Sequence, residues 1–393
     1  PVLVRTQAVP EHVIVDPVRH MPRLWSTAWS LGLTSSSQAT STRKLYLQHL
    51  DSFYRYCDER FGADAFDEGM STRDAEGVML MVESFYLTTT SDPAYNTTDV
   101  QRWGVVRAFV QSLAKRLAPS NPEWAAAASM LAAMGRMRAP RLGGFRFIRA
   151  LPKTTLLDLL EVAHPSSPRN PFKGYQTRVR NWLIVNLMLL AGLRRGEALL
   201  LACDSLKEDV DPESGEVVRW LDITTVFEND PRSTTPRIKT LESHRQIPVS
   251  EDLALLYQHF AAEHRPTDAG HGFLLTTKAG APLSAEALSK VFRKLTDALA
   301  PEAIQSLFDR SGGKTNISPH DLRHTCATAR YTMFMELNPD RELAIQRMRA
   351  FFGWSARSAM PEHYARAAIQ DDLMQAWNTL FAEKTSLMRG ISA

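Results

Sequence analysis

The spacing of apolar residues in the first third of the chain is the feature that most constrains its fold. After a Ser/Thr-rich stretch at 35–41, one apolar stripe consists of Tyr46, Leu50, Phe53, Tyr54 and Cys57. Intervals of three and four residues place such side chains on one face of an α-helix. The stripe therefore predicts an amphipathic helix that buries this face in a core.

Further helices are predicted in the same region. One follows Thr72 and has Asp74 in its first turn. The next begins after Thr98, where Gln101 completes a capping-box pattern, and the last spans 125–137. The chain shows no internal repeat, so this part is predicted to be an all-α bundle of unlike helices.

The second half of the chain alternates helical patterns with a short sheet of two or three strands. Enrichment in Val, Ile, Thr and Trp at 217–227 predicts a strand, and 237–249 can return as its antiparallel partner. Helices are predicted at 182–190, 252–263, 285–298, 319–337 and 369–381. The predicted fold class is a two-domain, mainly α protein, with an all-α N-terminal bundle and an α+β C-terminal domain that carries a small antiparallel sheet.

The length of 393 residues exceeds what one hydrophobic core usually organises, which favours two domains. We predict an N-terminal extension of unknown role at 1–34, a helical domain at 35–138, a linker at 139–150 and a second domain at 151–393. With 44% apolar and 23% charged residues, the composition is that of a globular protein and excludes a disordered chain.

The cysteines and the hydropathy of the chain indicate the cellular compartment in which the protein folds. Cys57, Cys203 and Cys326 are isolated, which gives neither a disulfide framework nor a cysteine zinc site and suits a reducing cytoplasm. Residues 1–24 lack the apolar core of a secretory signal. The most apolar stretch, 182–190, is far shorter than the ~20 residues that span a bilayer, so no membrane contact is predicted.

A basic segment joins the two predicted domains. It has no acidic residue between Glu123 and Asp158, and its basic residues are Arg136, Arg138, Arg141, Arg146, Arg149 and Lys153. Alone, this pattern fits either a solvated connection or a segment that crosses a phosphate backbone. The net charge of +3 is too small to decide between them.

Three short passages carry candidate chemistry, and the first, at 191–197, reads Ala-Gly-Leu-Arg-Arg-Gly-Glu. Gly192 is predicted to end the preceding helix in the left-handed conformation, and the next helix to begin near Arg194. Arg194 and Glu197 are three residues apart. They form either a surface ion pair or part of a site that presents a guanidinium at the helix junction.

The second passage, at 318–324, reads Ser-Pro-His-Asp-Leu-Arg-His. Ser318 suits a helix N-cap, and the proline after it suits the first helical position. His320, Arg323 and His324 then share one helix face near exposed backbone N–H groups, which favours an anion such as phosphate. A structural His pair and a zinc peptidase helix are the alternatives, but the latter needs Glu directly after the first His and a third ligand. No metal site is predicted.

The third passage is Phe351-Phe352-Gly353-Trp354, and Tyr364 follows ten positions later. Each of these aromatic residues alone could be simple core. Their order after the first two passages is what makes them candidates for a site.

Taken in this order, the passages resemble the motifs of the tyrosine recombinases, also called phage integrases. That family carries A-G-L-R-x-x-E, then H-x-L-R-H, then Gly followed by His or Trp, and a late Tyr. The stretch with Lys239, Ser243 and Arg245 is similar to the family's lysine-bearing turn between strands. The resemblance covers about 151–381, the catalytic domain, through specific motifs, while 36–138 is similar to the family's helical core-binding domain, which binds DNA, through its pattern alone.

The resemblance implies the tyrosine recombinase fold and a site-specific DNA recombinase that uses no metal or other cofactor. It would cleave and rejoin duplex DNA through a 3′-phosphotyrosyl intermediate and a Holliday junction. Tyr364 would be the nucleophile. Arg194 and Arg323 would bind phosphate oxygens through their planar forks of donors. The choice of Arg194 over Arg195 rests on the register with Gly192.

The resemblance implies that other residues transfer protons during the reaction. By resemblance, Lys239 would protonate the departing 5′ oxygen, with Lys278 as the alternative lysine. His320 would accept the proton of Tyr364 or hold the phosphate, and His324 would add a hydrogen bond.

Two further residues would support the reaction. Trp354, at a position where His is commoner, donates only through its indole N–H, which suits a phosphate oxygen. Glu197 would hold the histidine and arginine side chains in place. The spacing from Trp354 to Tyr364 is one residue longer than in most members, and His363 precedes the tyrosine.

Two domains and a basic linker suit a clamp around duplex DNA whose affinity falls with salt. Candidate DNA contacts in the first domain are Arg102, Arg107 and Lys115, in addition to the six basic residues at and beside the linker. Such a protein would be cytoplasmic and associated with the nucleoid.

Beyond the tyrosine, one more apolar stripe consists of Ile369, Leu373, Trp377, Leu380 and Phe381. It predicts a helix that either packs within its own chain or, as the family implies, docks on a neighbouring subunit in a tetramer on two DNA sites. Alternatives to recombination with the same chemistry are a type IB topoisomerase and a hairpin telomere resolvase. From other classes, the alternatives are a catalytically inactive DNA-binding protein and a zinc hydrolase.

Overall fold

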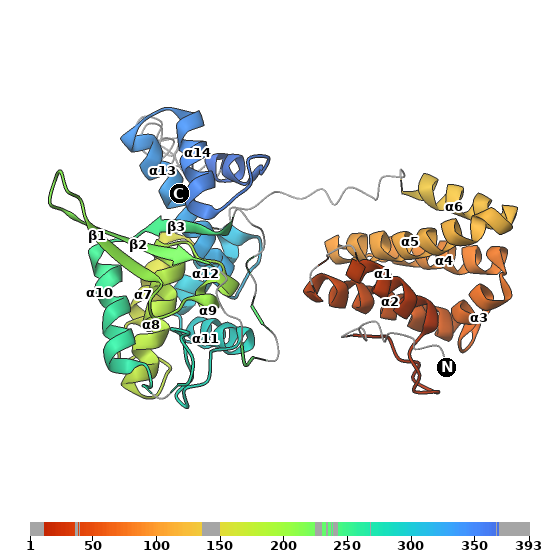
Figure 1. The fold of residues 1–393 in the computed structure, drawn as a ribbon, viewed down its shortest axis with the longest axis horizontal. Coiled ribbons are helices and arrows are strands. Elements are labelled where there is room, and N and C mark those ends of the chain that lie inside the picture. The colour runs from red at the N-terminus through yellow and green to blue at the C-terminus, as the bar shows by residue number, and fades with distance from the viewer. Residues whose placement is uncertain are drawn as a thin grey trace, which may run out of the picture. The chain divides into compact units, whose positions relative to one another are not determined.

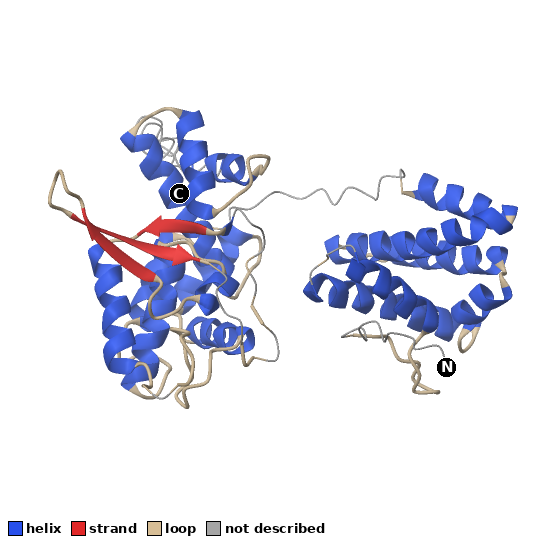
Figure 2. Cartoon of the chain, in the orientation of Figure 1, coloured by secondary structure: helices blue, strands red, loops and turns tan. Residues whose placement is uncertain are grey.

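The structure is a computed structural model, and it describes residues 12–35, 38, 40–135, 150–224, 230–232, 235–236, 238, 243–267, 269–366 and 368. The chain divides into two compact units, 1–145 and 146–393. Each unit has its own hydrophobic core. The first is all α, and the second combines helices with a small antiparallel sheet, so the predicted fold class is confirmed (Figures 1 and 2).

The helices of the first unit are α1 (Leu24–Ser35), α2 (Thr40–Phe61), α3 (Ala65–Thr72), α4 (Ala75–Thr90), α5 (Thr97–Leu117) and α6 (Pro122–Met134). The predicted apolar stripe lies on α2, where Leu50, Phe53 and Cys57 are fully buried. Helix α2 packs against α5, which buries Val106 and Phe109 completely. The stripe therefore marks the centre of this core, as its spacing predicted.

Two helix starts differ from the prediction because other side chains supply the caps. Asp74 is the N-cap of α4 and does not lie in its first turn, since its carboxylate accepts a 2.9 Å bond from the backbone N–H three residues later. Asn96 caps α5 by accepting from the backbone N–H of Thr98 at 2.8 Å. Asp99 returns the bond to the backbone N–H of Asn96 at 3.0 Å. The capping box predicted at Thr98 and Gln101 is therefore wrong.

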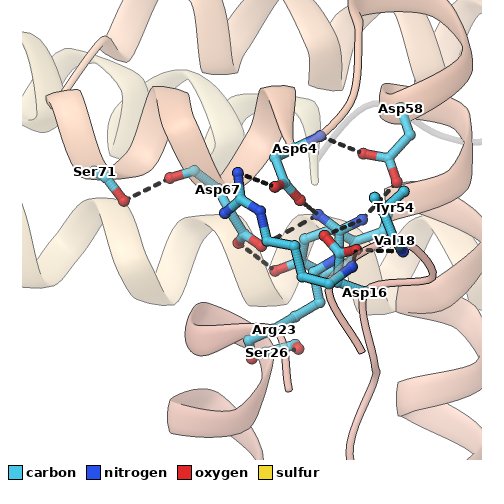
Figure 3. Close-up of polar contacts among 10 residues, drawn as sticks. Asp16, Val18, Arg23, Ser26, Tyr54, Asp58, Asp64, Asp67 and Ser71 are labelled. Atoms are coloured by element: carbon cyan, nitrogen blue, oxygen red, sulfur yellow. Dashed lines mark hydrogen bonds and ion pairs between the residues drawn. The ribbon is translucent and has the colours of Figure 1, made fainter. Parts of the chain in front are cut away.

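The described part of the predicted N-terminal extension is tied to the first unit by a buried ion network (Figure 3). The side chain of Arg23 is 3% exposed and lies 2.5 Å from Asp58 Oδ2 and 2.7 Å from Asp64 Oδ1. A third carboxylate, that of Asp67, lies 3.3 Å away. Trp29 of α1 belongs to the core of the unit. This segment is thus part of the helical unit's packing.

The helices of the second unit are α7 (Lys153–Ala163), α8 (Tyr175–Leu190), α9 (Arg195–Leu200), α10 (Glu251–His259), α11 (Ala285–Asp297), α12 (Pro301–Ser311), α13 (Pro319–Leu337) and α14 (Arg341–Phe352). A π-helical turn at Phe260–His264 extends α10, and residues 360–366 are helical. Helix α8 contains the predicted buried stretch, with Leu183, Ile184 and Leu187 fully buried. Among the described residues, none of the helices is long and apolar enough to cross a membrane.

The sheet has the order β1 (Leu206–Val210), β2 (Val217–Ile223) and β3 (Arg245–Pro248), and both pairings are antiparallel. The predicted pairing of two strands is confirmed, and β1 adds a third strand through the turn at 211–215. Leu221 pairs with Ile247, and both are fully buried in the core of the unit. Strand β3 packs against α14, so the sheet and the end of that helix meet where the candidate site lies.

Candidate active site

Arg194 and Glu197 lie at the start of α9, directly after a left-handed glycine. Gly192 has φ +59°, as the sequence predicted. A Cβ added to Gly192 would stand 2.5 Å from Cε1 of Phe352, so the turn passes very close to the end of α14. The carboxylate of Glu197 accepts from the backbone N–H of Arg194 at 2.9 Å. It therefore caps α9 while it also faces the Arg194 side chain.

Helix α13 starts at the predicted N-cap, Ser318. Asp321 completes a capping box, because its Oδ2 accepts from the backbone N–H of Ser318 at 2.7 Å. His320 is exposed, whereas Arg323 and His324 are buried. The two imidazole ring centres lie 4.3 Å apart. The predicted shared face thus extends from the surface into the core.

Three guanidiniums surround the carboxylate of Glu197, which is 2% exposed. Arg194 Nη1 lies 2.5 Å from Oε1, Arg245 Nη2 lies 3.0 Å from Oε2, and Arg323 Nη1 lies 3.7 Å from Oε2. Burial raises the pKa of Glu197, but the three positive charges outweigh it and lower the pKa from 4.5 to about 2. The carboxylate is therefore ionised at neutral pH, and three cations around one anion leave a surplus of two positive charges.

Backbone carbonyls from two other elements hold the Arg323 guanidinium. Nη1 donates to the carbonyl of Gly192 at 2.5 Å, and Nη2 donates to that of Phe352 at 2.9 Å. The guanidinium carbon lies 4.9 Å from the ring centre of Phe352 and 5.7 Å from that of Trp354. Burial lowers the pKa of Arg323 from 12.5 to about 9, with the Glu197 charge opposing the shift. Arg323 is still a cation at neutral pH.

Tyr364 lies on the helical segment 360–366 and is 2% exposed. Its phenol oxygen lies 2.6 Å from Nδ1 of His324. Its ring stacks on Trp354 with a centroid distance of 5.4 Å and an interplanar angle of 8°. Trp354 in turn stacks on Phe352 at 4.7 Å and 18°. The three rings thus form one continuous stack that ends at the candidate nucleophile.

Contacts therefore connect most of the predicted catalytic residues: Arg194, Glu197, His320, Arg323, His324, Trp354 and Tyr364. The adjacent Arg195 instead donates to Ser289 Oγ of α11 at 3.0 Å, which favours Arg194 for the site. Lys239 lies outside the described residues. The alternative lysine, Lys278, lines a small pocket with Arg180 and His264.

Arg245 is the candidate site residue that the sequence reasoning missed. Besides Glu197, it contacts the backbone carbonyl of Phe351 through Nε and that of Ser243 through Nη1, both at 2.7 Å. A signal was available, because residues two apart on a strand point to the same face. Ile247 is fully buried, so Arg245 on the same strand also faces inward.

The predicted DNA contacts of the first unit do not gather on one face. An α-helix turns by ~100° per residue. Arg107 therefore lies about 140° around α5 from Arg102, and Lys115 lies about 220° around it. Arg102 also pairs with Asp99 on the same helix at 2.7 Å. Lys153 is the first residue of α7 and is exposed. The other basic residues, Arg136, Arg138, Arg141, Arg146 and Arg149, lie outside the described residues, as does the stripe Ile369, Leu373, Trp377, Leu380 and Phe381.

Comparison with known proteins shows that residues 156–370 match the phage integrase family. The chain belongs to this family. The matched segment contains all the candidate catalytic residues, Lys239 included. Membership supports DNA recombinase or integrase activity in general for this chain. Among curated protein sequences, none matches the chain significantly.

Solved structures similar to this integrase include three recombinases. A lambda integrase dimer bound to a COC′ core site has 13% identity, with 82% of this chain and 92% of that chain covered and a TM-score of 0.41. XerH recombinase bound to a palindromic difH substrate has 15% identity, coverage of 94% and 98%, and a TM-score of 0.41. The integrase from mycobacterium phage Brujita has 12% identity, coverage of 88% and 91%, and a TM-score of 0.29.

Proposed function

We propose that this integrase cleaves and rejoins duplex DNA at specific sites through a covalent bond between Tyr364 and a 3′ phosphate. One observation carries the proposal: the buried phenol oxygen of Tyr364 lies 2.6 Å from the imidazole of His324, which directly follows Arg323 on α13. A phenol attacks a phosphodiester efficiently only with a proton acceptor and donors for the phosphate oxygens beside it. The imidazole of His324 would be the proton acceptor, and Arg323, next to it on α13, would be a donor to the phosphate.

In the proposed step, the Tyr364 oxygen bonds to phosphorus while the bond from phosphorus to the 5′ oxygen breaks. The phenol proton passes to a histidine, either His320 or His324, and the 5′ oxygen takes a proton from Lys239. Rejoining runs the same step backwards, with a 5′ hydroxyl as the attacking group. The covalent link conserves the phosphodiester energy, so no external energy source is needed.

Arg194 and Arg323 would bind the non-bridging oxygens of the phosphate. Their forks of donors match those oxygens, and the surplus positive charge around Glu197 opposes the negative charge that develops in the transition state. Trp354 would add a hydrogen bond through its indole N–H. Because guanidiniums supply the positive charge, the proposed reaction proceeds in EDTA.

The proposal extends to partners and assembly. The two domains predicted at 35–138 and 151–393 would clamp a duplex together with the basic linker at 139–150, mainly by phosphate contacts. Two cleaved duplexes would exchange strands through a Holliday junction in a tetramer joined by the helix predicted at 369–381. The lambda integrase named above was solved as a dimer on a core site, and XerH on a difH substrate. A chain truncated after Arg366 that still assembled two sites and recombined them would overturn the role of this helix.

The test of the chemistry is a nicked duplex that traps the covalent intermediate. A binding site is first selected from a pool of randomised duplexes, then incubated in EDTA with wild type, Tyr364→Phe and, as a control, Tyr175→Phe, whose tyrosine is 57% exposed. Wild type and the control are expected to form a protein–DNA adduct through the 3′ phosphate, and Tyr364→Phe none. An adduct with Tyr364→Phe, or none with wild type on bound DNA, overturns the proposal.

If the adduct forms, the topology of the products separates recombination from the related reactions. Joined strands from two duplexes indicate recombination. Relaxed circles alone indicate a type IB topoisomerase, and hairpin ends indicate a telomere resolvase.

A further inference from the structure

The helix that follows the sheet ends in a π turn that carries two histidines. Helix α10 ends at His259, and the π turn spans Phe260–His264. In an α-helix, residues five apart stand about 140° apart around the axis. Here the backbone N–H of Arg265 bonds to the carbonyl of Phe260, five residues earlier, at 2.9 Å. This wider turn brings His259 and His264 to the same side.

The two imidazoles lie within hydrogen-bond distance of each other but are not aligned end to end. Nε2 of His259 lies 3.1 Å from Nε2 of His264, and the ring centres lie 4.7 Å apart with an interplanar angle of 88°. A straight hydrogen bond of this length between two imidazoles would place the ring centres about 5.4 Å apart. The observed rings are closer, so the two nitrogens do not point straight at each other.

A shared metal ion accounts for both distances. Two imidazole nitrogens at about 2.05 Å from one ion, with an angle near 98° at the ion, stand about 3.1 Å apart and put their ring centres about 4.8 Å apart. We propose that His259 and His264 bind one divalent transition-metal ion, such as Zn²⁺, through their Nε2 atoms. Imidazole suits Zn²⁺, Ni²⁺ and Cu²⁺, and this angle lies between those of square-planar and tetrahedral sites.

The surroundings leave one side of the pair open. His259 is exposed and His264 is half-buried, with the ring of Tyr175 at 5.6 Å on one side and the side-chain amide of Gln176 donating to the His264 carbonyl. Within the described chain no three His, Cys, Asp or Glu side chains form a metal-binding group, so water completes the coordination.

The two histidines have no role in the proposed recombination chemistry, and an ion bound to them would act on the fold. The π turn buries Phe260, whose side chain is 1% exposed, in the core of the second unit. An ion held by both histidines would fix the turn that seats this side chain. The expected effect of the metal is therefore a higher melting temperature.

The test uses the full chain freed of metal by a chelator and titrated with Zn²⁺ in a calorimeter. Wild type is expected to bind one ion more than His259→Gln/His264→Gln, and each single variant to bind that ion at least about tenfold more weakly. His12→Gln, which removes another exposed histidine, is the matched control and is expected to bind as wild type does.

A second measurement keeps the proposal falsifiable if a variant is less stable. Added Zn²⁺ is expected to raise the melting temperature of wild type and His12→Gln but not that of the double variant. With Cu²⁺, electron paramagnetic resonance is expected to show two imidazole nitrogens in wild type and fewer in either single variant. Equal zinc binding by wild type and the double variant overturns the proposal and leaves only a hydrogen bond between the two imidazoles.

Discussion

At the scale of single residues, one carboxylate organises the candidate site. Glu197 touches Arg194, Arg245 and Arg323, which come from three different segments of the chain. Without Glu197, three guanidiniums would face one another at close range. The same carboxylate caps α9, so its position is fixed by the backbone as well as by its ion pairs.

The pKa of Glu197 gives the first prediction. The pKa of Glu197 is lowered from 4.5 to about 2 in the folded chain. The ionised carboxylate therefore stabilises the folded state fully above pH 4.5, and this stabilisation is lost as the pH falls toward 2. Glu197→Gln is expected to lower the free energy of unfolding by about 3 kcal/mol at pH 7, with the deficit shrinking in acid. Urea unfolding of both proteins from pH 7 to pH 3 measures this, and parallel pH curves would contradict it.

Adjacent arginines provide a matched pair for the proposed chemistry. Arg194 contacts Glu197 in the site, whereas Arg195 contacts Ser289 outside it. Arg194→Ala is therefore expected to slow adduct formation about 10²-fold or more, and Arg195→Ala to leave it essentially unchanged. Single-turnover rates on the nicked duplex, with DNA binding measured alongside, check this. If Arg195→Ala slowed adduct formation and Arg194→Ala did not, Arg195 would be the site residue in place of Arg194.

At the scale of elements, glycine turns decide how the helices of the site meet. Gly192 ends the turn after α8, and its carbonyl accepts from the Arg323 guanidinium. Gly353, with φ +60°, ends α14 in the same left-handed way and leads directly into Trp354. Both turns point the chain back toward the buried arginine.

A pair of glycine substitutions separates backbone strain from steric collision. Gly192 and Gly215 both have positive φ, but an added Cβ meets Phe352 at 2.5 Å at Gly192 and nothing within 4 Å at Gly215. Gly215→Ala is expected to cost about 1–2 kcal/mol from strain alone. Gly192→Ala is expected to cost more, because Phe352 must move. Denaturant midpoints measure the difference, and equal losses would show that no collision occurs.

Local signals in the sequence predicted elements well and their contacts less well. The Ser-Pro start of α13 and the left-handed Gly192 followed from local chemistry, and both are confirmed. The bond between Tyr364 and His324 joins residues 40 apart, so no local spacing could reveal it. The strand alternation with Ile247 could have shown that Arg245 faces inward, but not which groups it meets, because its partners come from α9 and α14. The cap of α5 was misplaced because two polar residues near it compete for the same role.

At the scale of the whole molecule, the chain has two separate cores. The first includes residues 14–134 and the second residues 151–365. The sequence predicted two domains but gave no role to the first 34 residues. Their contribution depends on Arg23, whose partners lie at Asp58, Asp64 and Asp67, and a pattern within the segment cannot show such pairing.

Separate cores predict separate unfolding. Arg23→Gln leaves several carboxylates without their shared cation and is expected to destabilise the first unit by about 3 kcal/mol. Glu197→Gln is expected to affect the second unit alone. Differential scanning calorimetry of the two variants measures this as shifts in two different transitions. A single transition shifted by both variants would show that the units unfold together.

The stack of Tyr364 on Trp354 has an optical consequence. The emission of an indole depends on what lies against its face, and here that face is covered by the phenol at an interplanar angle of 8°. Any displacement of the phenol toward a DNA strand uncovers the indole and changes its emission. Subtracting the spectrum of Trp354→Phe isolates this residue from the other seven tryptophans. The chain thus carries its own unlabelled fluorescent reporter of where its tyrosine lies.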